Sequence, residues 1–453
     1  MGTVGQSCPL PVRILISPIT LVYYALRVYC FSCIGIYLRR IARTILRALS
    51  RIVCCGVGLT YRDKNFPPGP QSLGSELVAK FQGDSVQWKR ADELVSATDK
   101  HFHLFSKGVH ADDVKQGAVG DCWLVAAMST LAASIPGAIA KLFINSEYSS
   151  RGKYKVRLFD IVKGTWCTMV IDDQIPTQQG SPIFAKPNGN ELWVILLEKA
   201  IAKYCGSYSA ISGGFEAWGL KVLTGNNVFF FRRSSATASS DWSWRRYEFR
   251  FKPSETDIRA ASTLKTNEVH DSKKFWSILL AYAAGQSGAM CCSIIGKTVE
   301  GQRRDGLIEL HAYSILRCVD LHGQKLIQIR NPWGARGEWK GAWSDGSSQW
   351  RSSPLIKAAL KHRESNDGTF WMCWQDFSKV WSEITICARS RDASDLFLDV
   401  NEDLGCPGPT VGCVGGCLRY WVCCRGCRHV VCPVASDAET RAGRSCVGCV
   451  CCV

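Results

Sequence analysis

The segment QGAVGDCWLVAAMSTLA, which begins at Gln116, changes character at a single cysteine. Turn-forming glycines precede Cys122 and helix formers follow it, so Cys122 is predicted to lie in the first turn of a helix. Amide N–H groups and the positive end of the helix dipole stabilise a thiolate there and lower the thiol pKa. A cysteine before an apolar helix is more often a small buried hydrophobe, so a nucleophile needs further support.

A cysteine nucleophile needs an imidazole partner from a separate element. His311 lies in GLIELHAYSILRCVD, which is rich in β-branched and aromatic residues and is predicted to be a strand. A turn at residues 322–323 and a second strand, KLIQIRN, would complete a hairpin that brings Asn331 beside His311. The Asn331 carbonyl could accept the imidazole N–H and fix its tautomer, and Gln116 could donate to an oxyanion. Each residue alone is more often structural, but their ordered combination favours a cysteine protease.

The composition is that of a globular protein of two or three domains, with 453 residues, 46% hydrophobic and 21% charged. The net charge of +16 could indicate nucleic-acid binding. However, five arginines concentrate between residues 39 and 51, before the globular part, with no acidic residue until Asp63. This distribution is more typical of a membrane-surface segment than of a nucleic-acid groove, so no nucleic-acid partner is predicted.

Residues 1–60 are predicted to be a membrane-associating segment. The apolar run 14–38 is long enough to cross a bilayer, but Pro18 and Arg27 interrupt it, so spanning the membrane and lying on it both remain open. Residues 34–52 then alternate apolar and arginine faces at helical spacing. Such a helix suits an anionic lipid surface, although it could instead pack on the protein. We expect a cytoplasmic, membrane-associated protein.

Most of the 24 cysteines lie at the two ends, in residues 8–55 and 406–452, and the middle holds only scattered ones such as Cys167, Cys205 and Cys318. Secreted disulfide scaffolds are normally short and carry a cleavable signal, so reduced thiols in a cytosolic setting fit better. In the Cys-rich tail 400–453, pairs at 424/427 and 446/449 have the spacing of a Zn²⁺ site. Additional cysteines blur that pattern, so acylated or unstructured thiols are favoured over zinc.

Three strings, QGAVGDCWL, GLIELHAYS and RNPWGARGEWKGAWSD, closely resemble the catalytic blocks of calpains, the calcium-dependent cytosolic cysteine proteases. The resemblance extends over roughly residues 65 to 393 and includes VIDDQIPT, NELWVILLEKAIAKYCGSY and NDGTFWMCWQDF. It implies an α+β fold, the papain-like calpain core, with a helical first lobe at 65–215 and a β-rich second lobe at 216–393. The active site would lie in the cleft between the lobes.

The same resemblance assigns roles to individual residues. It implies a catalytic triad of Cys122, His311 and Asn331, with Gln116 as oxyanion donor. It implies two Ca²⁺ sites, the first formed by the Gly108 carbonyl, Asp113 and Glu191, and the second by Glu338, Asp345 and Asp367. Three departures from the family pattern concern these sites. Thr369 stands where a further acid is usual, and one extra residue lies in the loop 335–337 before Glu338; both changes weaken the second calcium site. Leu310 replaces the usual glycine before His311.

The predicted function is therefore limited, calcium-regulated proteolysis of intracellular proteins at a membrane surface. The alternative is a catalytically impaired scaffold with the calpain fold, anchored at membranes. The chain after residue 393 is too short for the β-sandwich and EF-hand domains of conventional calpains, and no EF-hand loop pattern occurs. Association with an EF-hand small subunit is therefore not expected.

Overall fold

A computed structural model describes residues 60–81, 85–94, 102–106, 108–118, 120–234, 242–250, 262–284, 286–296, 301–334 and 337–390. The predicted membrane-associating segment, apart from its last residue, and the Cys-rich tail lie outside these residues, as do the predictions made for them. In the part of the chain that is described, no helix combines the length and the apolar character needed to cross a bilayer.

The first part of the described chain is mainly helical and also contains five short or paired strands. Its helices are α3 (Pro70–Leu73), α4 (Ser75–Lys80), α5 (Cys122–Ser134), α6 (Ala138–Leu142), α7 (Trp193–Cys205) and α8 (Glu216–Thr224), with 3₁₀ turns at Ala91–Glu93, Ala111–Asp113 and Ser209–Ile211. Its strands are β1 (Gln87–Lys89), β2 (Lys153–Asp160), β3 (Thr165–Asp172), β4 (Ile175–Gln178) and β5 (Ser181–Pro182).

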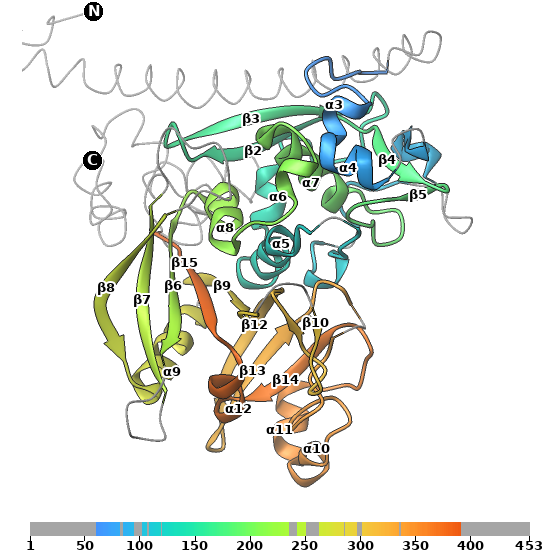
Figure 1. Ribbon diagram of the computed structural model, residues 1–453. Coiled ribbons are helices and arrows are strands. Elements are labelled where there is room, and N and C mark those ends of the chain that lie inside the picture. The colour runs from blue at the N-terminus through green and yellow to red at the C-terminus, as the bar shows by residue number, and fades with distance from the viewer. Residues whose placement is uncertain are drawn as a thin grey trace, which may run out of the picture. The chain divides into compact units, whose positions relative to one another are not determined.

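The second part is built on an eight-stranded antiparallel sheet in the order β14-β13-β12-β9-β15-β6-β7-β8 (Figure 1). Its strands are β6 (Asn227–Ser234), β7 (Ser243–Arg250), β8 (Ser262–His270), β9 (Gly288–Ser293), β12 (Ala312–Leu321), β13 (Gln324–Arg330), β14 (Thr369–Cys373) and β15 (Glu383–Ala388), beside the small pair β10 (Gly301–Gln302) and β11 (Ile308–Glu309). The helices here are α9 (Ser272–Ala283), α10 (Gln349–Ser352), α11 (Pro354–Leu360) and α12 (Trp374–Val380). The predicted α+β class is confirmed.

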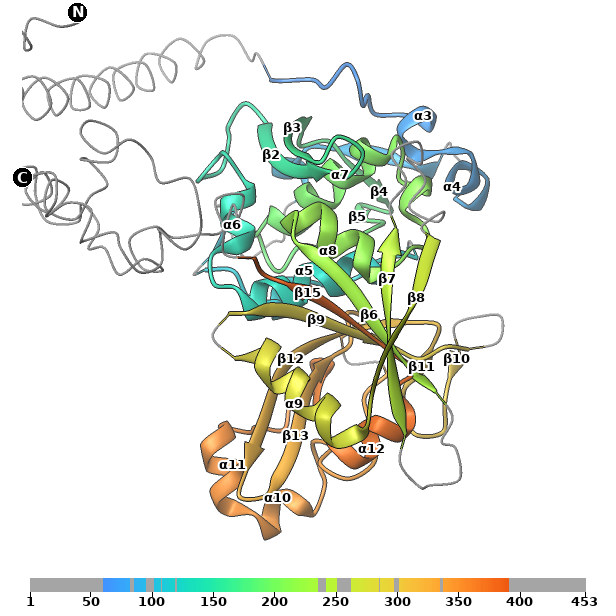
Figure 2. The ribbon, with the colours of Figure 1, turned by 90° about the vertical axis from the view of Figure 1, so that its left-hand side faces the viewer.

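Strand β9 shows how the sheet separates two cores. Ala289 and Cys291 belong to the core that contains α5, α7 and α8, whereas Met290 and Cys292 belong to the core that contains α9 and α12. This alternation follows from the two-residue period of a strand. The small side chains face α5, which lets the helix approach the sheet closely, as Figures 1 and 2 show. The predicted lobe boundary at 215/216 falls at the start of α8 and remains a prediction.

Strands β12 and β13 form the hairpin that the sequence predicts. They pair antiparallel with Ser314 opposite Arg330, and the connecting residues His322 and Gly323 both have positive φ, 49° and 77°. Two positive φ values are required by the hairpin turn whose twist matches that of the strands. The hairpin prediction is therefore confirmed.

The prediction of one continuous strand over GLIELHAYSILRCVD is wrong at Leu310. Leu310 has φ of 53°, and β12 begins only at Ala312. The Leu310 amide donates to the carbonyl of Ile294. A left-handed residue cannot continue a strand, so the chain turns at Leu310 and places His311 directly before β12 rather than inside a strand.

Candidate active site

Cys122 is the first residue of α5 and carries a half-buried thiol. The helix behind it is buried on all sides, since every residue from 123 to 131 is buried. Trp123 is fixed by a hydrogen bond from its indole N–H to the carbonyl of Ile211, at 3.0 Å. The sequence-based prediction of a thiol in the first helical turn is confirmed, and the surrounding core holds that turn rigidly.

The loop before Cys122 is held at both ends by backbone hydrogen bonds. The Ala118 amide donates to the carbonyl of Ile183, and the Gly213 amide donates to the carbonyl of Gly120, each at 2.8 Å. At Gly117 a Cβ would lie 1.8 Å from the carbonyl oxygen of Phe184. Glycine is therefore needed at residue 117 because another backbone segment occupies the space that a side chain would take.

His311 and Asn331 lie together at the open end of the β12–β13 hairpin. Both are fully buried, and the imidazole Nε2 is 2.8 Å from Asn331 Oδ1. Asn331 is itself held, because its Oδ1 accepts the Trp333 amide, its Nδ2 donates to the Gly337 carbonyl and its backbone amide donates to the Gly368 carbonyl. With Nε2 donating to Asn331, the lone pair of the neutral ring is on Nδ1.

Two aromatic rings enclose this hydrogen bond. The Trp333 ring lies 4.4 Å from the His311 ring between centroids, and Tyr313 meets the imidazole edge-on at 5.1 Å. The Tyr313 hydroxyl accepts the Ile308 amide and donates to the Gly337 carbonyl. Burial raises the pKa of Tyr313, and negative charge on neighbours, Cys122 among them, adds to the rise. Sequence reasoning missed Tyr313, although its place two residues after His311 on the same strand face was a usable signal.

Direct contacts bring the cysteine loop to the hairpin. The Gln116 amide donates to the carbonyl of Pro332 at 3.0 Å, and the Ser314 hydroxyl donates to the carbonyl of Ala126 in α5 at 2.9 Å. The Thr130 hydroxyl lies 2.8 Å from the Met290 carbonyl and 3.0 Å from the Ile315 carbonyl. The candidate nucleophile and the His–Asn pair therefore belong to one hydrogen-bonded assembly.

Arg330 also joins the hairpin to the chain that leads to Cys122, and it was not predicted from the sequence. Only 2% of this residue is exposed. Its guanidinium donates to the carbonyls of Val114 at 3.1 Å and Asp112 at 3.4 Å, on the chain that leads to Cys122. It also donates to the carbonyl of Asp367 at 3.0 Å. An arginine at the end of the apolar strand LIQIR was the available signal, since a buried guanidinium must be matched by several acceptors.

Two of the residues predicted for a first calcium site, Asp113 and Glu191, lie close together. Asp113 and Glu191 are both buried, and burial raises the pKa of Glu191 to about 7, with the Asp113 carboxyl adding to the rise. Asp113 accepts the His110 amide and Glu191 accepts the Ser106 amide, each at 2.7 Å. Gly108, whose carbonyl was predicted as a ligand, has φ of 108°. Two neighbouring buried carboxyls have the chemistry that a hard cation prefers.

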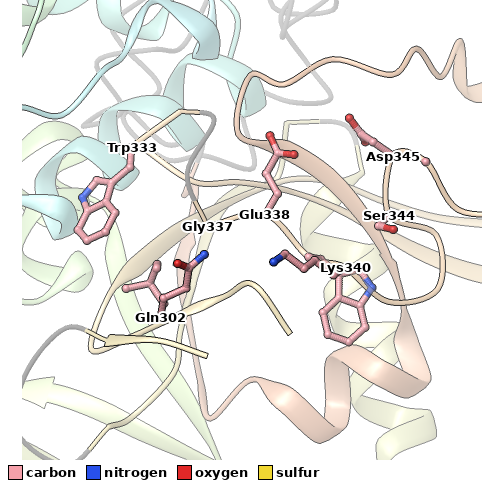
Figure 3. A pocket seen from close by; sticks show the side chains of 10 residues that line it. Gln302, Trp333, Gly337, Glu338, Lys340, Ser344 and Asp345 are labelled. Atoms are coloured by element: carbon pink, nitrogen blue, oxygen red, sulfur yellow. The ribbon is translucent and has the colours of Figure 1, made fainter. Parts of the chain in front are cut away.

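Two of the three residues predicted for a second calcium site line one pocket. Glu338 and Asp345 line a pocket of about 840 Å³, and Asp367 does not (Figure 3). Burial raises the pKa of Glu338 and of Asp345, and the Asp367 charge adds to both. Thr369 lies near Arg330 Nη1, at 3.4 Å. No cluster of three or more histidine, cysteine or acidic side chains positioned for a metal occurs among the described residues.

Comparison with known proteins gives the family. The protein-family model described as "Calpain family cysteine protease" matches residues 61–388 of this chain. "Calpain-type cysteine protease DEK1" of Arabidopsis thaliana is 35% identical over 337 residues, which cover 72% of this chain and 14% of that protein. "Calpain-1 catalytic subunit" of Bos taurus is 33% identical over 388 residues, covering 82% and 48% respectively.

The chain therefore belongs to the calpain family of cysteine proteases, as its resemblance to that family predicts. It spans less than half the length of these two relatives.

Proposed function

We propose that this chain is a calpain-like cysteine endopeptidase in which Cys122 is the nucleophile and His311 the general acid–base. The observation that carries the proposal is the buried His311–Asn331 hydrogen bond of 2.8 Å at a junction that also holds the loop before Cys122. Membership of a cysteine protease family supports the same chemistry.

In the proposed mechanism, the neutral imidazole accepts the Cys122 proton at Nδ1 while its Nε2–H remains bonded to Asn331. The thiolate attacks the peptide carbonyl carbon, and the oxyanion that forms is stabilised by the Cys122 backbone N–H and the Gln116 side-chain amide. The imidazolium then protonates the leaving amine as the C–N bond breaks, which leaves a thioester. Water, deprotonated by His311, hydrolyses that thioester and restores the thiol.

The proposal is tested by cleavage of casein, an unfolded protein substrate, by the full chain. Cys122→Ser and His311→Ala should each lower the cleavage rate by about 10³-fold or more, because nucleophile and base act as a unit. Cys205→Ser is the matched control, since Cys205 is also half-buried but lies at the far end of α7. The proposal fails if the wild type and Cys122→Ser cleave casein equally.

We further propose that Ca²⁺ regulates this activity, with Asp113, Glu191 and the Gly108 carbonyl holding one ion. When bound, Ca²⁺ would neutralise the facing carboxyls of Asp113 and Glu191. The pocket acids Glu338 and Asp345, with Asp367 nearby, would hold a second, weaker ion. Calorimetric titration should show that Glu191→Gln abolishes the tighter binding and that Asp345→Asn affects only the weaker binding. Equal binding of Ca²⁺ by the wild type, Glu191→Gln and Asp345→Asn would exclude these sites.

We propose that the substrates are intracellular proteins, cut at a membrane surface that the N-terminal segment binds. Cosedimentation with phosphatidylserine vesicles tests this, and phosphatidylcholine vesicles are the control. The expected result is binding to the anionic vesicles only. Equal recovery of the protein with both vesicle types, or with neither, would contradict it.

The alternative proposal, a catalytically impaired scaffold, is favoured by one observation. Leu310 lies directly before His311, has a positive φ and is 38% exposed, where the family pattern has glycine. Labelling of Cys122 by a thiol-directed peptide electrophile separates the two functions. A scaffold would label Cys122 no faster than Cys205, whereas an enzyme would label Cys122 selectively.

A further inference from the structure

Strands β6, β7 and β8 extend the sheet beyond β15, and strand register connects this extension to the candidate active site (Figure 2). Ala312, which follows His311, lies opposite Ser293 of β9. Ser293 lies opposite Glu383 of β15, and Glu383 lies opposite Arg232 of β6. One row of paired residues therefore leads from the residue after His311 to Arg232.

The row continues to a second arginine. Arg232 lies directly opposite Arg245 of β7, although like charges in this arrangement destabilise a strand pair. Arg232 Nη2 lies 2.7 Å from a Glu383 carboxylate oxygen, whereas Arg245 donates to the neutral carbonyl of Thr266 at 3.1 Å. Among the described residues no carboxyl forms an ion pair with Arg245, so the row carries one more positive charge than negative.

Aromatic rings lie beside these cations. Phe230 and Tyr247 stack with 4.9 Å between centroids, and the Arg232 guanidinium lies 5.3 Å from each of the two rings. Lys265 of β8 lies opposite Tyr247 and is exposed. The two-residue period of a strand places Arg245 and Tyr247 on the same side of the sheet. We call Arg232, Arg245, Tyr247 and Lys265 the basic face.

The acids of these strands belong to the other side of the sheet. Within residues 227–234, 243–250 and 262–270 the acids are Glu248 and Glu268, and both bond to Arg246. Arg246 lies 2.7 Å from Glu248 and 3.2 Å from Glu268. Its charge is therefore matched locally, whereas the described parts of the three strands supply no acid to Arg245 or Lys265.

Phe215 connects the basic face to the loop before Cys122. Its ring is 38% exposed and lies 6.2 Å from the ring of Phe249 in β7. Gly213, two residues before Phe215, donates its amide to the carbonyl of Gly120, two residues before Cys122. An extended chain that leaves Cys122 on this side would pass Phe215 and reach the basic face. The occupant that fits is therefore part of a chain already bound at the site.

We propose that the basic face binds acidic side chains of an extended substrate segment. The inference rests on the proposed proteolytic function and names a substrate class for it. Neighbouring strands are about 4.8 Å apart, so the row places Arg232 about 14 Å and Arg245 about 19 Å from Ala312. An extended chain rises about 3.3 Å per residue, so the acids should lie about four to six residues from the scissile bond. Carboxylates there would form charge-assisted hydrogen bonds with Arg245 and Lys265.

Cleavage-site profiling with the full chain tests this preference. A peptide library prepared from a proteome is incubated with the wild type, and the new peptide ends are identified by mass spectrometry. Asp and Glu should be enriched about four to six residues from the cut, on one side of it. Two matched peptides are then made from one cleaved sequence, with Glu or with Gln at the enriched positions.

The measured quantity is the ratio of kcat/KM for the Glu peptide to kcat/KM for the Gln peptide. Arg245→Gln combined with Lys265→Gln should lower this ratio about 5-fold, mainly through KM, because partly exposed ion pairs are individually weak. The wild-type ratio should also fall as NaCl is raised from about 50 to about 500 mM. Arg245→Glu combined with Lys265→Glu should transfer the preference to a matched Lys peptide, which a merely structural role would not do.

Arg317→Gln combined with Lys155→Gln is the matched control. It makes the same change in net charge at exposed positions of β12 and β2, so the ratio should stay at the wild-type value.

Absence of acidic enrichment, or an equal ratio in the wild type and in Arg245→Gln with Lys265→Gln, would overturn the inference, while cleavage itself would uphold the proposed function. A wild type that cuts no peptide and labels Cys122 no faster than Cys205 would overturn the proposed function and the inference with it. If the double variant keeps the wild-type ratio but no longer binds phosphatidylserine vesicles, the basic face binds lipid headgroups and the inference is wrong.

Discussion

At the scale of the single residue, Asn331 decides how His311 is oriented. Asn331→Ala removes the acceptor of the Nε2–H group, so the imidazole can rotate or change tautomer. We predict that kcat/KM for a peptide substrate falls by about 10²-fold, the usual consequence of a misplaced catalytic group. Asn145→Ala is the control, because Asn145 bonds the Lys153 carbonyl and lies outside this hydrogen-bond group. Retention of wild-type kcat/KM in Asn331→Ala would show that His311 needs no such anchor.

The residues of the candidate site differ in how far the sequence could predict them. Cys122 and the His311–Asn331 pair could be placed from local patterns, a helix start and a hairpin. Leu310 and Arg330 could not. Leu310 has high apolar character but adopts a conformation set by its tertiary contact with Ile294, and Arg330 contacts Val114, which lies far from it in the chain.

At the scale of secondary-structure elements, Arg330 joins the end of β13 to the chain before α5. Arg330→Met keeps most of the apolar stem but leaves the buried carbonyls of Val114 and Asp367 without their donor. We predict a loss of about 3 kcal/mol in the free energy of unfolding, measured in urea. Arg317→Met, at an exposed position of β12, should change it by less than about 1 kcal/mol. Equal effects of the two substitutions would contradict the role of Arg330.

Helix α8 carries a buried acid that should make the free energy of unfolding depend on pH. Burial raises the pKa of Glu216 to about 7, and the nearby Glu383 adds to the rise. Between about pH 4.5 and pH 7 the folded protein keeps a proton that the unfolded chain has released, so this stabilisation is lost as the pH rises through that window.

Urea unfolding at about pH 5 and pH 8 measures this effect. The Glu216 contribution to the wild-type free energy of unfolding should decline by up to about 3 kcal/mol between the two values, and Glu216→Gln should lack that decline. Glu147→Gln, at an exposed position, should behave as the wild type does. A decline of the same size in Glu216→Gln and wild type would mean that the proton is held elsewhere.

Elements with a local signal were the predictable part of the fold. The helix after Cys122 and the turn at residues 322–323 follow from residue types that favour those conformations. The order of the eight strands did not follow, because β15 pairs with β6 and β9, which precede it by 90 residues or more. Such pairings depend on packing between distant segments, which periodicity in one segment cannot indicate.

At the scale of the whole molecule, the described core brings two differently built parts together at α5. The helical part supplies the thiol, and the sheet supplies the imidazole and its amide anchor. The face of the sheet toward α5 carries small side chains. The opposite face, toward α9 and α12, carries large ones. We infer that catalysis depends on the junction between these parts rather than on either part alone.

The most direct test of this account is the pH dependence of Cys122 alkylation by iodoacetamide in the full chain, located by peptide mass spectrometry. An ordinary cysteine has a pKa of about 8.5 and reacts slowly below about pH 7. We predict that Cys122 reacts rapidly below pH 7 in the wild type, that His311→Ala removes this low-pH reaction, and that Cys205 in the same samples shows no such low-pH reaction. If instead Cys122 and Cys205 rise together with pH, and His311→Ala changes neither, then the thiolate–imidazole pair does not exist.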